Sequence, residues 1–168
     1  MDPAQRQSQS ATLAAALRLI RTHRRIRKAD LAQAMGMSPR NYDLFEAGKG
    51  RINLERIYRF AEITKSDYHA ILAALAFGSP AFALNTADNQ MMTILMAALQ
   101  DFEAEFGDLV GELDSRTIIN VFTRALKELA LQAVRRDDAA EAWLRRRVER
   151  LVPPSTPGPD DSPADPTP

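Results

Sequence analysis

Residues 28–49 constrain the fold of this chain more than any other stretch of the sequence. Leu31, Ala32 and Met35 recur at helical spacing and predict a first short helix with an apolar face. Ala32 is small, so a second helix can approach this face closely. Gly36 follows the last apolar residue, where the left-handed backbone that ends many helices is easiest for glycine. The stretch therefore predicts a short helix that ends in a tight turn.

A second helix is predicted directly after this turn. Ser38 is a good N-cap, and Pro39 stands at the first helical position, where its missing N–H costs nothing. Tyr42 and Phe45 are expected to be buried, and Gly48 ends the helix. Two short helices joined by a tight turn are the layout of a helix-turn-helix motif, whose second helix lies in the major groove of DNA.

The ordered set of signals resembles the Cro/C1-type helix-turn-helix family, also called the Xre or lambda-repressor-like family. The resemblance is carried by Leu31-Ala32-Gln33 through Gly36, by Ser38, and by Phe45-Glu46-Ala47-Gly48-Lys49. It implies a five-helix DNA-binding domain over residues 10–77 with a recognition helix at about residues 38–47. It also implies a structural pair between Arg21 and Glu46, whose bidentate geometry would register two helices. Two unrelated surface charges are the alternative.

The polar face of the second helix carries the candidates for reading DNA bases. Arg40 can make a two-pronged contact to O6 and N7 of guanine, and Asn41 and Asp43 are the next polar candidates. Leu44 stands where family members often carry a polar side chain, so it would pack against a thymine methyl or leave more of the readout to DNA shape. The candidates for phosphate contacts are Lys28, Ser38, Lys49 and Arg51. Simple solvation is the alternative for each cation.

The charges of the chain are distributed unevenly although their sum is zero. Residues 10–77 hold twelve lysines and arginines against six aspartates and glutamates, whereas residues 78–135 hold four basic side chains against eight acidic ones. This asymmetry indicates a basic, DNA-facing domain attached to an acidic domain with another task.

Helical periodicity predicts an all-α fold with two folded parts. Residues 1–9 are expected to be loose, and a helix is expected over residues 10–23 ahead of the motif. Asn53 can cap a fourth helix and Ser66 a fifth. Residues 78–87 begin with Gly-Ser-Pro and read as a linker.

Residues 88–152 predict a separate helical region for dimerisation or partner binding. Helices are expected over residues 88–106 and 115–134, and a last helix would carry Trp143. A heptad-like seam runs through Met92, Leu95, Leu99, Phe102 and Phe106. The proline-rich tail at residues 153–168 lacks apolar mass and is expected to be disordered.

Three helices make a thin core, so two copies that share their apolar faces are the favoured solution, ahead of packing onto the first domain. The chain is therefore predicted to be a sequence-specific double-stranded DNA-binding transcriptional regulator. It would act as a homodimer on two half-sites about one turn of DNA apart, with a repressor favoured over an activator. The alternative is an antitoxin or adaptor whose C-terminal helices bind a protein such as a toxin or RNA polymerase.

Composition argues against the competing classes. The chain has no cysteine and two histidines, His23 and His69, and we find no phosphate loop and no catalytic motif. We therefore expect no enzyme, no cofactor and no metal site. The polar N-terminus and the absence of a long apolar run favour a soluble cytoplasmic protein without membrane contact. The arginine run at residues 145–147 reads as a solvated helix face, and the alternatives are a second nucleic-acid contact or a dock for an acidic partner surface.

Overall fold

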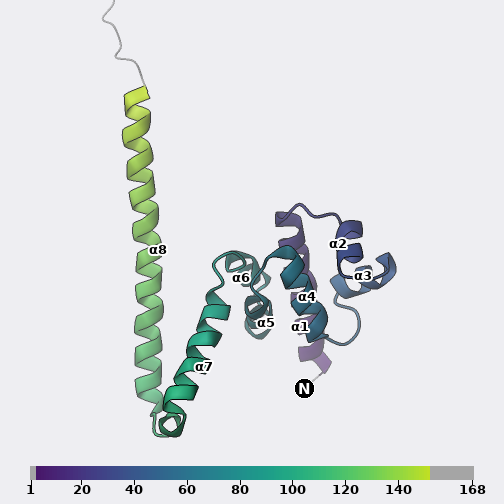
Figure 1. The fold of residues 1–168 in the computed structure, drawn as a ribbon, viewed down its shortest axis with the longest axis horizontal. Coiled ribbons are helices and arrows are strands. Elements are labelled where there is room, and N and C mark those ends of the chain that lie inside the picture. The colour runs from purple at the N-terminus through teal and green to yellow at the C-terminus, as the bar shows by residue number, and fades with distance from the viewer. Residues whose placement is uncertain (1–2, 152–168) are drawn as a thin grey trace, which may run out of the picture. The chain divides into compact units, whose positions relative to one another are not determined.

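The structure is a computed structural model that describes the backbone of residues 3–151 and the side chains of residues 4–135. Every element in this range is a helix, which confirms the predicted all-α class (Figure 1). The helices are α1 (Pro3–His23), α2 (Lys28–Ala34), α3 (Pro39–Glu46), α4 (Leu54–Thr64), α5 (Tyr68–Phe77), α6 (Pro80–Asn85), α7 (Met91–Val110) and α8 (Ser115–Leu151). They form two compact units, residues 1–110 and residues 111–168.

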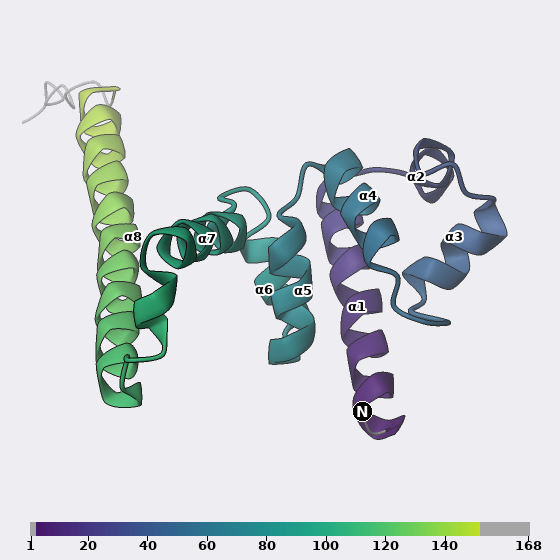
Figure 2. The same ribbon diagram turned by 60° about the horizontal axis from the view of Figure 1, so that its bottom comes forward.

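α1 is the central helix of the first unit. It packs against α3 on one side and against α5 and α6 on the other, and Figures 1 and 2 both show α3 and α6 on opposite sides of it. The largest apolar side chains of the shared core are fully buried and come from α1, α2, α3, α4 and α5: Leu17, Ile20, Leu31, Tyr42, Ile57, Phe60 and Ile71. The core therefore fixes α3 against α1.

The turn between α2 and α3 has the local structure that the sequence predicts. Gly36 is left-handed, with φ of 66°, and the next N–H, of Met37, donates to the carbonyl of Ala32 at 2.9 Å. Ala32 is buried, which allows the close approach of the two helices. The hydroxyl of Ser38 then accepts from the N–H of Asn41 at 3.3 Å and caps α3.

Two expectations for the first unit are corrected by the structure. Residues 3–9 are helical rather than loose, because they hold good helix formers and Pro3 occupies the first turn, where proline is tolerated. Residues 78–87 are not a linker, because they contain α6, whose Ala83 is fully buried. The Gly-Ser-Pro run ends α5, but a proline at the first helical position also suits the start of α6.

The C-terminal helices are longer than expected. α7 extends to Val110, with a non-helical backbone at Phe106 (φ −128°, ψ 19°), close to where its end was expected. α8 runs from Ser115 to Leu151 through the stretch after Val134, where a break was expected. Trp143, the arginine run at residues 145–147 and the tail at residues 153–168 lie outside the described side chains. No helix of the described part is long and apolar enough to cross a membrane.

Gly48 gives a test of how closely α1 and α3 approach. Its φ is 66°, and a Cβ there would lie 2.2 Å from the carbonyl oxygen of Ser10 on α1. Gly78 has nearly the same φ, 65°, but open space around it. Gly78→Ala is expected to lower the free energy of unfolding by about 1–2 kcal/mol, the cost of a left-handed L-residue. Gly48→Ala should cost at least about 1 kcal/mol more, because the backbone of α1 must move.

Urea denaturation of the two variants measures this difference. Equal losses for Gly48→Ala and Gly78→Ala would contradict the close approach.

Candidate nucleic-acid interface

A buried carboxylate joins the three helices of this region. Glu46 is only 1% exposed. Its Oε1 accepts from Nε of Arg21 at 2.5 Å and from the hydroxyl of Tyr42 at 3.0 Å. Its Oε2 accepts from Nη2 of Arg21 at 3.3 Å and lies 3.3 Å from Nζ of Lys28. Because Arg21 belongs to α1 and Lys28 to α2, one side chain of α3 ties the three helices together.

Burial and hydrogen bonding act on Glu46 in opposite directions. Burial would raise the pKa of its carboxyl, but the contacts with Arg21, Tyr42 and Lys28 hold this pKa below the usual value of 4.5. The hydrogen bond to Glu46 raises the pKa of Arg21. Burial raises the pKa of the Tyr42 hydroxyl, which therefore keeps its proton and remains a donor. The group is an ion pair whose lone pairs and protons are well satisfied.

A surface hollow opens beside this carboxylate, and we call it the basic hollow. It is lined by Arg18, Lys28, Arg40, Asp43, Leu44, Glu46, Ala47 and Lys49. Its four cations come from α1, α2, α3 and the loop after α3. Cations that converge from several elements on one concave surface suit a phosphate backbone, whose contacts orient a protein on DNA.

The base-reading candidates lie on the exposed face of α3. Arg40, Asp43 and Leu44 line the basic hollow, and Asn41 is exposed outside it. Leu44 is 42% exposed, so its side chain is accessible to an apolar group such as a thymine methyl. These four candidates on α3 therefore present one cation, one anion, one amide and one apolar side chain to the outside.

Two of the candidates are bound to each other. Nζ of Lys28 donates to Oδ1 of Asp43 at 2.9 Å, and this hydrogen bond raises the pKa of Lys28. Both side chains are more than half exposed, and exposed ion pairs contribute little stability. A phosphate that displaces Asp43 from Lys28 therefore gives up little, although Nζ of Lys28 also lies 3.3 Å from Oε2 of the buried Glu46.

The other phosphate candidates lie at the two ends of α3. Ser38 stands at the N-terminal end, where its hydroxyl is engaged in capping. Lys49 lines the basic hollow and also a neighbouring hollow, which Arg51 lines as well. Both cations are exposed. Donors at both ends of α3 would match the two phosphate strands that border a major groove.

Arg18 is a site residue that the sequence reasoning missed. It is exposed on α1 and lines the basic hollow. The available signal was its spacing, because Arg18 lies three residues before Arg21 and therefore on a neighbouring face of the same helix. Its position makes it a further candidate for a phosphate contact.

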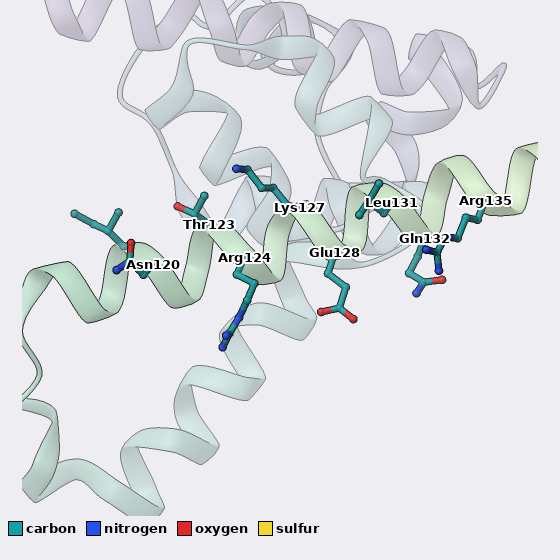
Figure 3. Close-up of a pocket in the computed structure, with 9 residues that line it drawn as sticks. Asn120, Thr123, Arg124, Lys127, Glu128, Leu131, Gln132 and Arg135 are labelled. Carbon is teal, nitrogen blue, oxygen red and sulfur yellow. The ribbon is translucent and has the colours of Figure 1, made fainter.

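Another hollow lies on α8, but it does not indicate a binding site. Its lining residues all belong to that one helix, and Figure 3 shows Asn120, Arg124, Glu128 and Gln132 along it. One helix face cannot enclose a ligand. Among the described side chains, no group of three or more histidines, aspartates and glutamates could hold a metal ion.

Comparison with known proteins found one family. Residues 17–68 match the family model described as helix-turn-helix, and this range includes α2, α3, α4 and the last part of α1, from Leu17 to His23. No curated protein and no solved structure matches the chain.

The buried carboxylate predicts how stability depends on pH. Because the pKa of Glu46 is lowered in the folded protein, its stabilising effect is present above pH 4.5 and is lost as the pH falls through the lower, folded value. Glu46→Gln is expected to lower the free energy of unfolding at neutral pH by about 1–3 kcal/mol, the cost of leaving Arg21 poorly paired. It should also flatten the acid side of the stability curve.

Chemical denaturation between pH 3 and 7 checks both effects. The control is Glu62→Gln, at an exposed carboxylate on α4. If the free energy of unfolding of Glu46→Gln fell with pH as it does in the original protein, Glu46 would not be the stabilising ionised carboxylate.

Proposed function

Through residues 17–68 the chain belongs to the Cro/C1-type helix-turn-helix family of DNA-binding transcription regulators, and we propose that it reads specific double-stranded DNA with α3 in the major groove. One observation carries this proposal. The basic hollow brings the exposed face of α3 together with cations from α1, α2 and the loop after α3. A base-reading surface and a phosphate-binding surface are therefore continuous.

The proposal assigns separate roles to the residues of this surface. Arg40 reads a guanine, and Asn41, Asp43 and Leu44 are the other base-reading residues. The phosphate contacts are assigned to Arg18, Lys28, Ser38, Lys49 and Arg51. Arg21 and Glu46 do not touch DNA in this proposal, because they hold α3 against α1 from inside.

A homodimer is the second element of the proposal. α7 exposes large apolar side chains, among them Ile94, Leu95, Leu99 and Phe102, and α8 exposes a comparable set that includes Phe122 and Leu126. Large apolar side chains exposed at many neighbouring helix positions are typical of protein–protein interaction sites. A second copy would cover both faces and supply the second recognition helix that a two-half-site operator needs.

A different protein partner is the alternative occupant of these apolar faces. In that case the chain would be an antitoxin or an adaptor, with a toxin or RNA polymerase on α7 and α8. Repression is favoured over activation. Which of the two occurs depends on where the operator lies relative to the promoter. The oligomeric state separates the dimer from this alternative.

Two substitutions test the roles on DNA. Arg40→Ala is expected to weaken binding to the specific DNA site, found by selection from random duplexes, by about 1–3 kcal/mol. It should weaken binding to scrambled DNA much less, because a bidentate base contact is lost. Lys28→Ala should weaken both by a similar factor and reduce the salt slope by about one per half-site, since fewer counterions are released. Titrations of both duplexes across a salt series measure these effects.

Arg27→Ala is the matched control for the phosphate contact. Arg27 precedes Lys28 and also forms an exposed ion pair, with Asp30, but it does not line the basic hollow. Its loss should leave the salt slope nearly unchanged. If Arg40→Ala lost equal affinity for the two duplexes, Arg40 would contact the DNA phosphate backbone rather than a base.

The dimer is tested in the full-length chain with Leu99→Glu. A charge in the apolar face of α7 should dissociate the dimer, because an unpaired charge is costly to bury. Leu19→Glu is the control, since Leu19 on α1 has the same exposed fraction as Leu99, 40%. Sedimentation at about tens of micromolar, near the range of weak specific association, reports the masses. An original protein that sediments as a monomer would contradict the dimer and favour a different partner.

A further inference from the structure

We propose that Asp67 is a positioning residue that sets the spacing between the two DNA half-sites. It would do so by fixing the start of α7, part of the proposed dimerisation region, on the DNA-binding domain. This inference rests on the proposed function, in which two copies of the chain bind one operator. It concerns how the two recognition helices are held apart, and not how either one reads bases.

Asp67 caps two helices at once. Its side chain is buried, with 2% of the residue exposed. Oδ1 accepts from the N–H of Ala70 at 3.2 Å and caps α5. Oδ2 accepts from the N–H groups of Met92 and Thr93 at 2.9 and 3.1 Å, at the start of α7. A carboxylate is favourable at a helix N-terminus, and here two such termini share one carboxylate.

The side chain of Thr93 strengthens this connection. Its hydroxyl donates to Oδ1 of Asp67 at 2.7 Å, and Nδ1 of His69 lies 3.1 Å from the same hydroxyl oxygen. Because the hydroxyl hydrogen points to Asp67, the N–H of the His69 ring is the donor in the second contact. Thr93 therefore joins α7 to two residues at the start of α5.

A second polar contact holds the chain just before α7. Nη2 of Arg24, the residue after the end of α1, donates a hydrogen bond to Oδ1 of Asp88 and another to the carbonyl of Lys65, the latter at 3.1 Å. α6 lies between Asp67 and Asp88 in the sequence, and it packs on α1 and α5. We call the set Asp67, Thr93, Arg24 and Asp88 the α7 joint. It holds the chain on both sides of residues 78–87, the range for which the sequence suggested a linker.

A rigid joint has a direct consequence for DNA. α3 and α7 lie on opposite sides of α1 (Figure 2), so the joint transmits the direction of α7 to the recognition helix through packed helices. Each added base pair moves a half-site by about 3.4 Å and turns it by about 35°, since one turn takes about 10.5 base pairs. A dimer in which α7 has a fixed direction therefore binds one half-site spacing well, whereas a dimer with a loose joint binds several spacings.

The experiment measures binding against half-site spacing with the full-length protein. The half-site is first obtained by selection from random duplexes with the original protein, and the spacing is then changed by one or two base pairs in each direction. The original protein is expected to lose about tenfold or more in affinity for each base pair, or about 1.4 kcal/mol. Asp67→Asn keeps an oxygen for α5 but presents an amide to the N–H groups of α7, so it should flatten this profile. Its affinity for a single half-site should stay within about twofold.

Two further variants make the result decisive. Thr93→Val removes only the hydroxyl, so it should flatten the profile partly and remains informative if Asp67→Asn does not fold. Asp114→Asn is the matched control, because Asp114 accepts from the N–H and the hydroxyl of Thr117 at the start of α8, outside the joint. It should leave the profile sharp.

The outcomes separate this inference from the proposed function. Profiles as sharp for Asp67→Asn and Thr93→Val as for the original protein would overturn the role of the joint and leave the dimer intact. A flat profile for an original protein that occupies both half-sites would do the same. Occupation of a single half-site at every spacing would overturn the proposed dimer function together with this inference.

Discussion

The ion pair around Glu46 is the contact on which the candidate interface depends. A buried charge is tolerated only when its partners are present and well placed, and Glu46 obtains partners from α1, α2 and its own helix. The same contacts fix how α3 leans on α1. Together with the apolar core, these contacts hold in place the part of α3 that lines the basic hollow, which Glu46 itself helps to line.

The motif itself could be predicted because its signals act over a few residues. Gly36 requires a left-handed backbone, and Ser38 offers a side-chain cap within one turn of helix. Each signal has a local physical cause that sequence spacing reveals. The candidates on α3 could be named for the same reason, because one face of a short helix is set by its period. The family match over residues 17–68 agrees with this segment of the prediction.

The joint could not be predicted because its contacts span 25 residues or more. Ser66 and Asp67 are both good N-caps, and only the packing of α7 shows why the carboxylate is used. Four donors from α5 and α7 converge on Asp67, and its two oxygens can accept from all of them, whereas a single hydroxyl oxygen accepts at most two hydrogen bonds. The Gly-Ser-Pro run was ambiguous for a related reason, since its residues suit the end of one helix and the start of the next. Arg18 was missed because its place in the basic hollow depends on how α1 crosses α3.

The double cap at Asp67 also decides where this chain can be divided. A fragment that ends after α5 lacks α6, which packs on α1 and α5. It also lacks the N–H groups of α7 that donate to Oδ2 of the buried Asp67. We therefore expect the smallest autonomous folding unit that contains α3 to reach past Thr93. The boundary that the sequence suggested at residues 78–87 falls inside the compact unit of residues 1–110, so α3 and the first turn of α7 are expected to fold and unfold together.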